Sequence, residues 1–522
     1  MPRGAAWPIG QPSLDRLAGQ SAAGPTGRDV VPVHAPFSGD VFGHVPRSIP
    51  EDVRAAVDRA RVAQRAWARR RFRERAGVLL RFHDLLLDLQ REVLDLMQVE
   101  AGKARAHALE EVVDTAIVAR YYAHHGERHL RPRRRRGALP VLTETRTGYH
   151  PLGVVGVIAP WNYPLTLAIT DALPALMAGN GVVLMPDAKT PFTALWGASL
   201  LGEAGLPRDL FQVVTGYGAE LGPALVESVD YVAFTGSLAV GRLVAGQAAA
   251  RMIGCSLELG GKNPMIVLDD ADLDAAVDGA LRGCFANAGQ LCLSFERLFV
   301  QAGLHDPFVG ALVERTRALK LGTGLDYDAD VGSLISEQHL ATVDAQVQDA
   351  IAKGARVLAG GRPRPDVGPW FYEPTILTDV GEGMTLFAEE TFGPVVAVYP
   401  FDSVGDVVER ANRSRYGLNA SVWTRDTRRG RAIASRIQTG TVNVNDAYAP
   451  AWASVDAPMG GFKESGLGRR HGAEGILKYT ESQTIAIQHG LPLAIPRGLS
   501  GERTSRILAD LLRAMRRIPG LR

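Results

Sequence analysis

Cysteine is scarce in this chain of 522 residues, whose three cysteines are Cys255, Cys284 and Cys292. The sequence has no Cys-x-x-Cys pair and no companion histidine spacing of a zinc site, so we predict no bound metal. A small disulfide-linked secreted domain would carry many more cysteines. We therefore expect a protein that works in the reduced cytoplasm.

Long apolar runs are also lacking. No stretch approaches the ~18 residues that a membrane span requires, and residues 1–29 have no apolar core of a signal peptide. These absences predict a chain with no membrane span. The mixture of Gly, Ala, Pro and Arg in residues 1–29 predicts a flexible N-terminal arm.

An excess of charge of one sign is missing too. Lysine and arginine number 58 against 56 acidic residues, so the formal net charge is +2. This balance gives no general electrostatic attraction for nucleic acid, and it favours small molecules as partners. A length of 522 residues exceeds the ~250–300 residues at which one hydrophobic core stops growing, so we expect two or more domains.

Two local clusters of arginine interrupt this even distribution. The run Arg131–Arg136 lies between a helical pattern and a strand, which favours a solvated loop without function. Near the C-terminus, arginines flank an apolar helical face formed by Ile507, Leu508, Leu511, Leu512, Met515 and Ile518. Such a helix fits either a membrane surface or the protein's own body. We expect docking on the body, because a subunit surface is always at hand.

Hydrophobic periodicity predicts an α/β fold. Residues 51–126 repeat apolar positions at helical spacing, whereas short apolar runs from residue 153 onward alternate with helix-length segments. That alternation predicts a parallel, doubly wound sheet, and the second half of the chain repeats the pattern as a second α/β domain. Two extended stretches, about 140–152 and 480–488, match neither alternation.

No Gly-x-Gly-x-x-Gly fingerprint follows the first predicted strand at 153–158, which argues against an ordinary dinucleotide dehydrogenase. Asn162 stands in that region, and its neutral amide can donate two hydrogen bonds, although alone it also fits a helix N-cap. Glu258 follows an apolar strand and precedes Gly260-Gly261, a context unlike that of a surface carboxylate, so it is a candidate general base. A lone cysteine is usually structural, and we interpret Cys255 and Cys284 in that way.

Five segments in a fixed order resemble the aldehyde dehydrogenase superfamily. They are Pro160–Pro164, Glu258–Lys262, Gly289–Cys292, Glu389–Pro394 and the glycine-rich Pro458–Arg469. The resemblance spans about residues 30–490. It is greatest to the NADP-type succinate-semialdehyde dehydrogenases, including the stretch Tyr479–Thr484.

The resemblance implies a fold of two doubly wound α/β domains and a β-stranded oligomerisation arm. The implied divisions are a cofactor-binding domain over 30–139 and 153–257, a catalytic domain over 258–476, the oligomerisation arm over 140–152 and 477–490, and an amphipathic tail over 491–522. An arm of this kind adds to a neighbouring subunit's sheet. We therefore expect a homodimer or a homotetramer.

The resemblance also implies a covalent mechanism for oxidising an aldehyde to a carboxylic acid. Cys292 would attack the aldehyde, and Asn162 with the backbone N–H of Cys292 would stabilise the oxyanion of the thiohemiacetal. Hydride transfer to an oxidised nicotinamide would leave a thioester, which water activated by Glu258 would hydrolyse. Lys262 and Asn263 are expected only to fix the loop.

Similarity to the family suggests which residues contact the cofactor. The expected set is Pro160, Trp161, Met185, Asp187, Ala188, Lys189, Gly236, Ser237, Glu390 and Phe392. The family's usual Lys-Pro-x-Glu is replaced by Met185-Pro186-Asp187-Ala188, so both usual ribose contacts are missing. Loss of the glutamate removes a charge that would repel a 2′-phosphate, and Lys189 is a nearby cation that would attract it. The carboxylate of Asp187 acts in the opposite direction, because it would repel the phosphate. We therefore predict NADP as the cofactor, with NAD possible.

The aldehyde itself is less well defined. Tyr163, Thr170 and Ser454 are the expected substrate contacts, with succinic semialdehyde as the leading substrate. Yet two substrate-binding arginines of better-known members fall on Thr170 and Ala286, so the ω-carboxylate would need another partner.

Two other functions stay open. Trp161, Tyr163 and Trp452 favour apolar or aromatic aldehydes if these side chains line a dry tunnel. An inactive binding or structural protein with the same fold is the alternative from another class. The joint presence of Asn162, Glu258 and Cys292 argues against an inactive protein, because a catalytic mechanism accounts for all three residues together.

Overall fold

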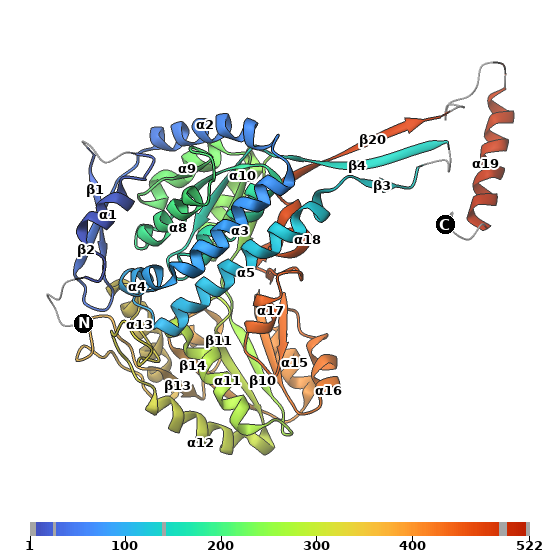
Figure 1. Cartoon of the computed structure of the whole chain (residues 1–522). Coiled ribbons are helices and arrows are strands. Elements are labelled where there is room, and N and C mark those ends of the chain that lie inside the picture. The colour runs from blue at the N-terminus through green and yellow to red at the C-terminus, as the bar shows by residue number, and fades with distance from the viewer. Residues whose placement is uncertain (1–6, 24–27, 138–141, 490–497, 499, 518–522) are drawn as a thin grey trace.

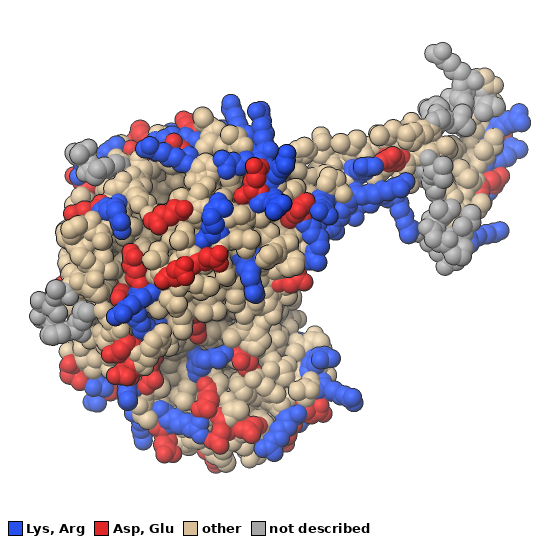
Figure 2. Space-filling model, viewed as in Figure 1, with Lys and Arg blue, Asp and Glu red and all other residues tan. Residues whose placement is uncertain are grey.

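The computed structural model describes residues 7–23, 28–137, 142–489, 498 and 500–517. Within these residues two large sheets and two short strand pairs belong to the body, and a three-stranded sheet extends away from it as an arm (Figure 1). The mixed α/β architecture with parallel sheets confirms the predicted fold class. Figure 2 shows acidic and basic side chains interspersed over the visible face of the body, in keeping with the small net charge.

The first sheet is parallel except at one edge. Its strands, in spatial order, are β19 (Gly466–Leu467), β9 (Gly254–Glu258), β8 (Tyr231–Thr235), β5 (Val154–Ala159), β6 (Gly181–Pro186) and β7 (Phe211–Val213). β19 pairs antiparallel with β9, while the other neighbours run parallel. From β5 the chain continues to β6 on one side and later to β8 on the other. Doubly wound sheets bind ligands at such a switch point, beyond the carboxyl ends of the strands.

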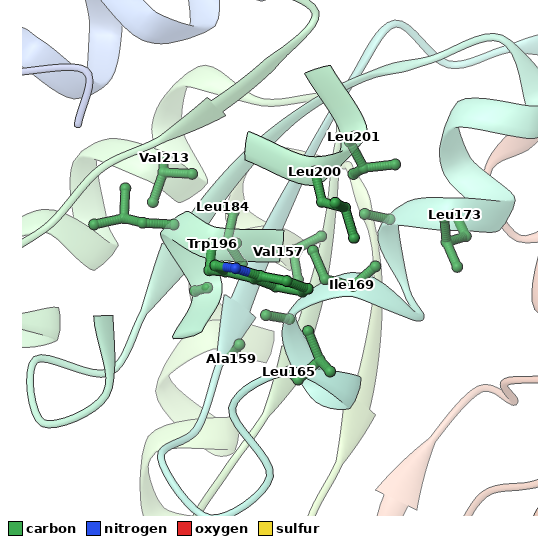
Figure 3. Close-up of a cluster of buried hydrophobic side chains, with 14 of the residues drawn as sticks. Val157, Ala159, Leu165, Ile169, Leu173, Leu184, Trp196, Leu200, Leu201 and Val213 are labelled. Atoms are coloured by element: carbon green, nitrogen blue, oxygen red, sulfur yellow. The ribbon is translucent and has the colours of Figure 1, made fainter. Parts of the chain in front are cut away.

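Alternating side chains of β5 enter two different cores, as the two-residue period of a strand requires. Val154 and Ile158 pack with the helices on one face of the sheet, which are α2 (Pro50–Trp67), α9 (Gly218–Ser228) and α10 (Leu238–Ala250). Val155 and Val157 pack on the other face, against α3 (Phe72–Asp88), α4 (Gln90–Ala101), α5 (Arg105–Leu130), α6 (Thr166–Ile169), α7 (Ala172–Ala178) and α8 (Pro191–Glu203). Figure 3 shows Trp196 of α8 lying among Val157, Leu165 and Ile169 in this second core.

The second sheet supplies the opposite side of the body. Its order is β12 (Arg356–Ala359), β13 (Thr375–Thr378), β14 (Val395–Phe401), β11 (Phe295–Gln301), β10 (Asn263–Val267), β16 (Asn419–Trp423) and β17 (Thr441–Val444). Only β12 runs antiparallel among these strands. The associated helices are α11 (Leu273–Phe285), the 3-10 turn η1 (Ala286–Gly289), α12 (Ala302–Ala318), α13 (Glu337–Ala352), α14 (Thr385–Ala388), α15 (Val404–Asn412), α16 (Thr427–Ala434) and α17 (Ala449–Ala453). The later helix α18 (Gly472–Leu477) packs instead on α5 and α7, beside the first sheet. A short pair, β15 (Tyr416–Gly417) and β18 (Phe462–Lys463), joins the glycine-rich segment to this domain.

The arm consists of β20 (Thr480–Gln488), β4 (Thr143–Pro151) and β3 (Arg133–Arg135) in that order. β20 and β4 pair antiparallel from Thr480 with Pro151 to Gln488 with Thr143, so the two expected extended stretches lie together (Figure 1). Residues 140 and 141 lie outside the described residues. The predicted loop at Arg131–Arg136 is wrong, because its middle forms β3. Backbone pairing with β4 satisfies one edge of β3 while the arginine side chains remain exposed, as charged side chains do on edge strands.

The two ends of the chain also differ from expectation. The predicted flexible arm over 1–29 contains α1 (Gln11–Ala18), whose Leu14 and Leu17 are buried, and a hairpin of β1 (Val30–His34) and β2 (Val41–Pro46) follows it. Burial of these leucines on α8 and β2 orders the helix. The C-terminal amphipathic helix forms as α19 (Gly501–Arg517), but it lies beyond the arm, away from the two large sheets (Figure 1).

Docking of α19 on the chain's own body was therefore a wrong prediction. Ile507, Leu511 and Leu512 on its apolar face are 54%, 41% and 61% exposed, while Ile518 lies outside the described residues. None of the helices within the described ranges combines the length and the apolar character needed to cross a membrane.

Candidate active site

A cavity of about 230 Å³ opens where the carboxyl ends of the first sheet meet two loops of the second domain. It is lined by Pro160, Trp161, Asn162, Leu167, Thr235, Gly236, Ser237, Glu258, Leu259, Gly260, Cys292, Glu390 and Phe392. The three candidate catalytic residues therefore share one cavity with six of the expected cofactor contacts. This position fits the ligand-binding edge of a doubly wound sheet.

The loop before Cys292 has an unusual backbone. Asn287, Ala288 and Gly289 have φ values of 50°, 55° and 70°, in the left-handed region. A Cβ at Gly289 would lie 2.0 Å from the carbonyl oxygen of Gly393, so this close approach requires glycine. The loop thereby turns the half-buried Cys292 side chain into the cavity.

Asn263 anchors the next turn of this loop. Its Nδ2 donates to the carbonyl oxygens of Cys292 at 2.7 Å and of Ser294 at 2.8 Å. Its Oδ1 accepts from the backbone N–H of Asn419 at 2.9 Å. All three bonds join its side chain to backbone groups of distant segments, which agrees with the expectation that Asn263 has a structural role.

Asn162 is held from both ends. Its side-chain Nδ2 donates to the carbonyl oxygen of Gln290 at 3.0 Å, and its own carbonyl oxygen accepts from Lys103 Nζ at 2.7 Å and from Asn287 Nδ2 at 3.0 Å. Lys103 in turn forms a fully buried ion pair with Glu111. Since the amide carries two N–H groups, its second N–H can donate to an oxygen that acquires negative charge in the cavity that Asn162 and Cys292 both line.

Glu258 is the last residue of β9 and lies opposite Gly466 of β19. Its side chain is buried, and Oε1 has no hydrogen-bond partner among the described residues. Burial raises the pKa of Glu258 to about 7, while Arg470 and Lys478 oppose that rise. A carboxyl group with such a pKa can both accept and release a proton near neutral pH.

Cys292 is a thiol in this environment. Burial raises its pKa to about 12, and the carboxylates of Glu390 and Glu258 act in the same direction. Arg470 opposes this shift only in part. A nucleophilic role for Cys292 therefore requires a base or an added positive charge near the sulfur.

An aromatic group bounds one side of the cavity. The Trp161 ring meets the Phe392 ring edge-on at 5.6 Å between centroids, and it lies at the same distance from the His339 ring. His339 Nε2 is 2.8 Å from the carbonyl oxygen of Phe392. Phe392 itself has a φ of 54°, so its backbone depends on support from its neighbours.

That support comes from a buried ion pair between Lys262 and Glu296, with Nζ and Oε2 2.5 Å apart. Glu296 also accepts hydrogen bonds from the backbone N–H groups of Thr391 and Phe392 at about 3.0 Å. Nearby, Glu390 Oε1 accepts from the Gly261 N–H at 2.8 Å. Through Glu296, Lys262 thus supports a loop other than its own, and that loop carries two of the expected cofactor contacts.

Helix α10 begins at this cavity. Ser237 is its N-cap and accepts from the Val240 N–H at 3.5 Å, so the other first N–H groups of the helix remain available to an anion. The expected ribose contacts lie outside the cavity lining. Lys189 Nζ is 3.5 Å from Asp187 Oδ1, and Met185 packs into the core beneath α9.

The expected substrate contacts do not line the cavity either. Tyr163 is buried, and its hydroxyl donates to Glu110 Oε2 at 3.3 Å. Thr170 donates to the Thr166 carbonyl at 2.6 Å and accepts from Arg470 at 2.8 Å, so its hydroxyl is already satisfied. Ser454 is exposed and donates to the carbonyl oxygen of Pro450 at 2.6 Å.

Sequence reasoning missed several residues of the site. Leu167 was detectable, because it lies one helical turn after Tyr163, and Thr235, Leu259 and Gly260 adjoin residues already singled out. Other residues had no local signal. Glu296 lies within a strand and His339 in the first turn of a helix, so only the fold brings them to the loop at Thr391–Phe392.

Comparison with known proteins agrees with this geometry. Residues 23–485 match the model of the aldehyde dehydrogenase family. The chain is 52% identical over 489 residues to the putative succinate-semialdehyde dehydrogenase [NADP(+)] of Mycolicibacterium smegmatis, covering 94% of this chain and 95% of that protein. Identity to the succinate-semialdehyde dehydrogenase [NADP(+)] of Escherichia coli is 38%, covering 88% and 94%.

Solved structures are similar as well. An NADP-dependent enzyme of Escherichia coli matches with a TM-score of 0.84 at 38% identity, covering 88% of this chain and 95% of that one. Betaine aldehyde dehydrogenase of Staphylococcus aureus, in complex with NAD+, matches with a TM-score of 0.87 at 31% identity, covering 94% and 99%. The chain belongs to the aldehyde dehydrogenase family.

Proposed function

We propose that this protein oxidises succinic semialdehyde to succinate with NADP as the oxidant. The observation that carries the proposal is the cavity that Asn162, Glu258 and Cys292 share with the N-terminus of α10. The curated relatives described above are named as NADP(+) succinate-semialdehyde dehydrogenases, which supports both the substrate and the cofactor.

The residues present fit a dinucleotide. Gly236 and Ser237 offer helix N–H groups to its phosphates, and Trp161 and Phe392 bound the cavity with aromatic surface. A Cβ at Gly260 would lie 2.0 Å from Glu390 Oε2, so only glycine allows the backbone at residue 260 to pack this closely against the Glu390 side chain. When bound, the oxidised nicotinamide supplies a positive charge and accepts the hydride.

Glu258 performs the proton transfers in this mechanism. With a pKa of about 7 it takes the proton of the Cys292 thiol as the sulfur attacks the aldehyde carbon. Glu258 then passes that proton to solvent, and its carboxylate is free to remove a proton from water once the acyl group is attached to the sulfur. The water oxygen attacks the thioester carbon, the C–S bond breaks, Glu258 returns the proton to the Cys292 sulfur, and the acid is released.

Asn162 and the backbone N–H of Cys292 stabilise the oxyanions of both steps. The bonds from Lys103 and Asn287 to the Asn162 carbonyl hold that residue, so its amide need not reorganise as charge develops. One lost oxyanion donor typically costs about 2.7–4 kcal/mol of transition-state stabilisation.

The preference for NADP follows from Lys189 and from Ala188, which removes the usual obstructing carboxylate. Lys189 is 45% exposed and pairs with Asp187 only at 3.5 Å, so a 2′-phosphate can compete for its ammonium group. Met185 contributes to this site only by packing. NAD remains an alternative cofactor.

An aromatic cluster favours a second candidate substrate class. The Trp452 ring lies 5.6 Å from the Tyr163 ring and 6.0 Å from the Tyr448 ring, and Glu110 accepts from both tyrosine hydroxyls. The three rings lie outside the lining of the cavity, and their aromatic surface suits an apolar or aromatic aldehyde better than an ω-carboxylate. Thr170 and Ser454 supply no charge for that carboxylate.

Steady-state kcat/KM for succinic semialdehyde, butanal and benzaldehyde, each with NADP and with NAD, tests the proposal. Preference for succinic semialdehyde with NADP supports it. A higher kcat/KM for butanal or benzaldehyde would instead assign the protein to apolar or aromatic aldehydes. Equal kcat/KM values with NAD and NADP would show that the protein has no cofactor preference.

We infer further that the domain over 30–139 and 153–257 binds the cofactor and that 258–476 supplies the thiol. Among the described residues of the arm over 140–152 and 477–490, β20 is an edge strand that pairs with β4 on one side, and its Ile485 and Ile487 are exposed, which supports a homodimer or homotetramer. Three free cysteines are compatible with work in the cytoplasm.

A further inference from the structure

A buried charged cluster is centred on Asp171 and Arg470. Arg470 Nη2 donates to Asp171 Oδ2 at 3.0 Å and to Thr170 Oγ1 at 2.8 Å. Lys478 Nζ donates to Asp171 Oδ1 at 3.1 Å. One carboxylate thus serves two cations, and the cluster has one positive charge in excess.

The position of Arg470 is fixed by its backbone as well as by its side chain. Its N–H and carbonyl oxygen pair with Met459 at 2.7 and 2.8 Å, so it closes the hairpin of the glycine-rich segment. Its side chain is 9% exposed, and Asp171 and Thr170 restrain the guanidinium from one side. A buried arginine with such restraints cannot move away to solvent without breaking several bonds.

Glu258 lies beside the hairpin that Arg470 closes. Its own strand holds it beside Gly460, where a Cβ would lie 3.2 Å from Glu258 Oε1. That oxygen has no hydrogen-bond partner among the described residues. The titratable and charged groups that act on it are Asp171, Arg469, Arg470, Lys478, Tyr231 and Cys292.

We propose that Arg470 is a positioning residue that keeps Glu258 ionised and directed at the cavity. It acts through its charge and does not contact the reacting atoms. The inference rests on the proposed role of Glu258 as the base. Asp171 sets the strength of the effect, because its carboxylate offsets part of the charge of Arg470.

The direction of the effect follows from the charges. Burial raises the pKa of Glu258, and Arg470 is the largest influence that opposes this rise, followed by Lys478. Glu258 and Asp114 both stabilise the charged form of Arg470, after the larger contribution of Asp171. Removing the guanidinium charge therefore raises the pKa of Glu258, and removing the carboxylate of Asp171 lowers it.

Hydrolysis of p-nitrophenyl acetate tests this inference without a cofactor or the natural aldehyde. The Cys292 sulfur displaces p-nitrophenolate, and water then releases acetate from the thioester. The burst of p-nitrophenolate reports acylation, and the steady-state rate at saturating ester reports deacylation. The pH dependence of the steady-state rate gives the apparent pKa of the base.

We expect this apparent pKa to rise by roughly one pH unit or more in Arg470→Met. It should stay near the wild-type value in Arg470→Lys and fall in Asp171→Asn. The matched control is Arg356→Met, because Arg356 pairs with Asp379 at the surface and is absent from the cavity lining. Thermal unfolding of each variant shows whether it is folded.

A uniform loss of rate with an unmoved pH profile in Arg470→Met would overturn the inference. If Arg470→Met does not fold, its pH profile cannot be compared with that of Asp171→Asn. In that case, an unchanged pH profile in Asp171→Asn overturns the inference. The role of Glu258 as the base is contradicted if the wild-type pH profile has no limb near pH 7, or if that limb is still present in Glu258→Gln. The two failures are thereby distinguishable.

Discussion

The buried pair of Lys262 and Glu296 gives a prediction whose size follows from its contacts. Glu296 accepts from Lys262 Nζ and from the N–H groups of Thr391 and Phe392, and both charged side chains are nearly inaccessible. Glu296→Ala leaves the Lys262 ammonium buried without a counterion. Breaking a buried pair in this way typically costs about 3–5 kcal/mol.

Lys262→Met should cost less, because Glu296 retains its bonds to the two backbone N–H groups. Burial already lowers the pKa of Lys262, and Glu296 opposes that shift. In Glu296→Ala the pKa of Lys262 should fall further, so the variant should lose least stability at high pH, where the amine is neutral. The double variant should be more stable than the sum of the two single losses predicts.

Urea unfolding of the four proteins, followed by tryptophan fluorescence and circular dichroism, measures these differences. The dissociation constant for NADP should rise in parallel, because the loop that carries Phe392 and Glu390 loses the hydrogen bonds that hold it. A loss below about 1 kcal/mol in Glu296→Ala, or strict additivity in the double variant, would refute the reasoning.

Three further predictions concern the site. Glu258→Gln should remove the limb of the kcat profile near pH 7, because the ionised carboxylate is the active form above its pKa of about 7; a profile like that of the wild type contradicts this. Lys189→Ala should weaken NADP by roughly 1–3 kcal/mol and leave NAD unchanged in competitive binding measurements, whereas equal effects mean that the 2′-phosphate does not lie there. Gly260→Ala should raise KM for the cofactor at least tenfold, because the added Cβ meets Glu390. Gly246→Ala, with no atom within 4 Å of its Cβ, is the control, and similar values for the two alanine variants would sink the steric argument.

Local sequence predicted those parts of the fold that local patterns determine. The alternation after residue 153 predicted strands such as β5 and β6, because a strand buried on both faces is an uninterrupted apolar run. The order of the motifs and their resemblance to a known family predicted that Asn162, Glu258 and Cys292 belong to one site, and they line one cavity. Their chemical roles are still predictions.

Features that depend on tertiary contacts were predicted less well. The arginine run at 133–135 has the composition of a loop, and only the neighbouring β4 makes it a strand. The short helix at Gln11–Ala18 becomes ordered because Leu14 and Leu17 find a core elsewhere in the chain. Arg470 could not be recognised as a partner of Glu258, because the two are brought together by the pairing of distant segments.

The covalent intermediate on Cys292 is the central claim of this account. The most direct test is mass spectrometry of peptides from the wild-type protein, quenched with acid during turnover with succinic semialdehyde and NADP. We predict the mass of one succinyl group on the peptide that contains Cys292, and none on the peptides with Cys255 or Cys284. An unmodified Cys292 peptide from protein that forms NADPH, or a succinyl group on either of the other cysteines, would contradict the account.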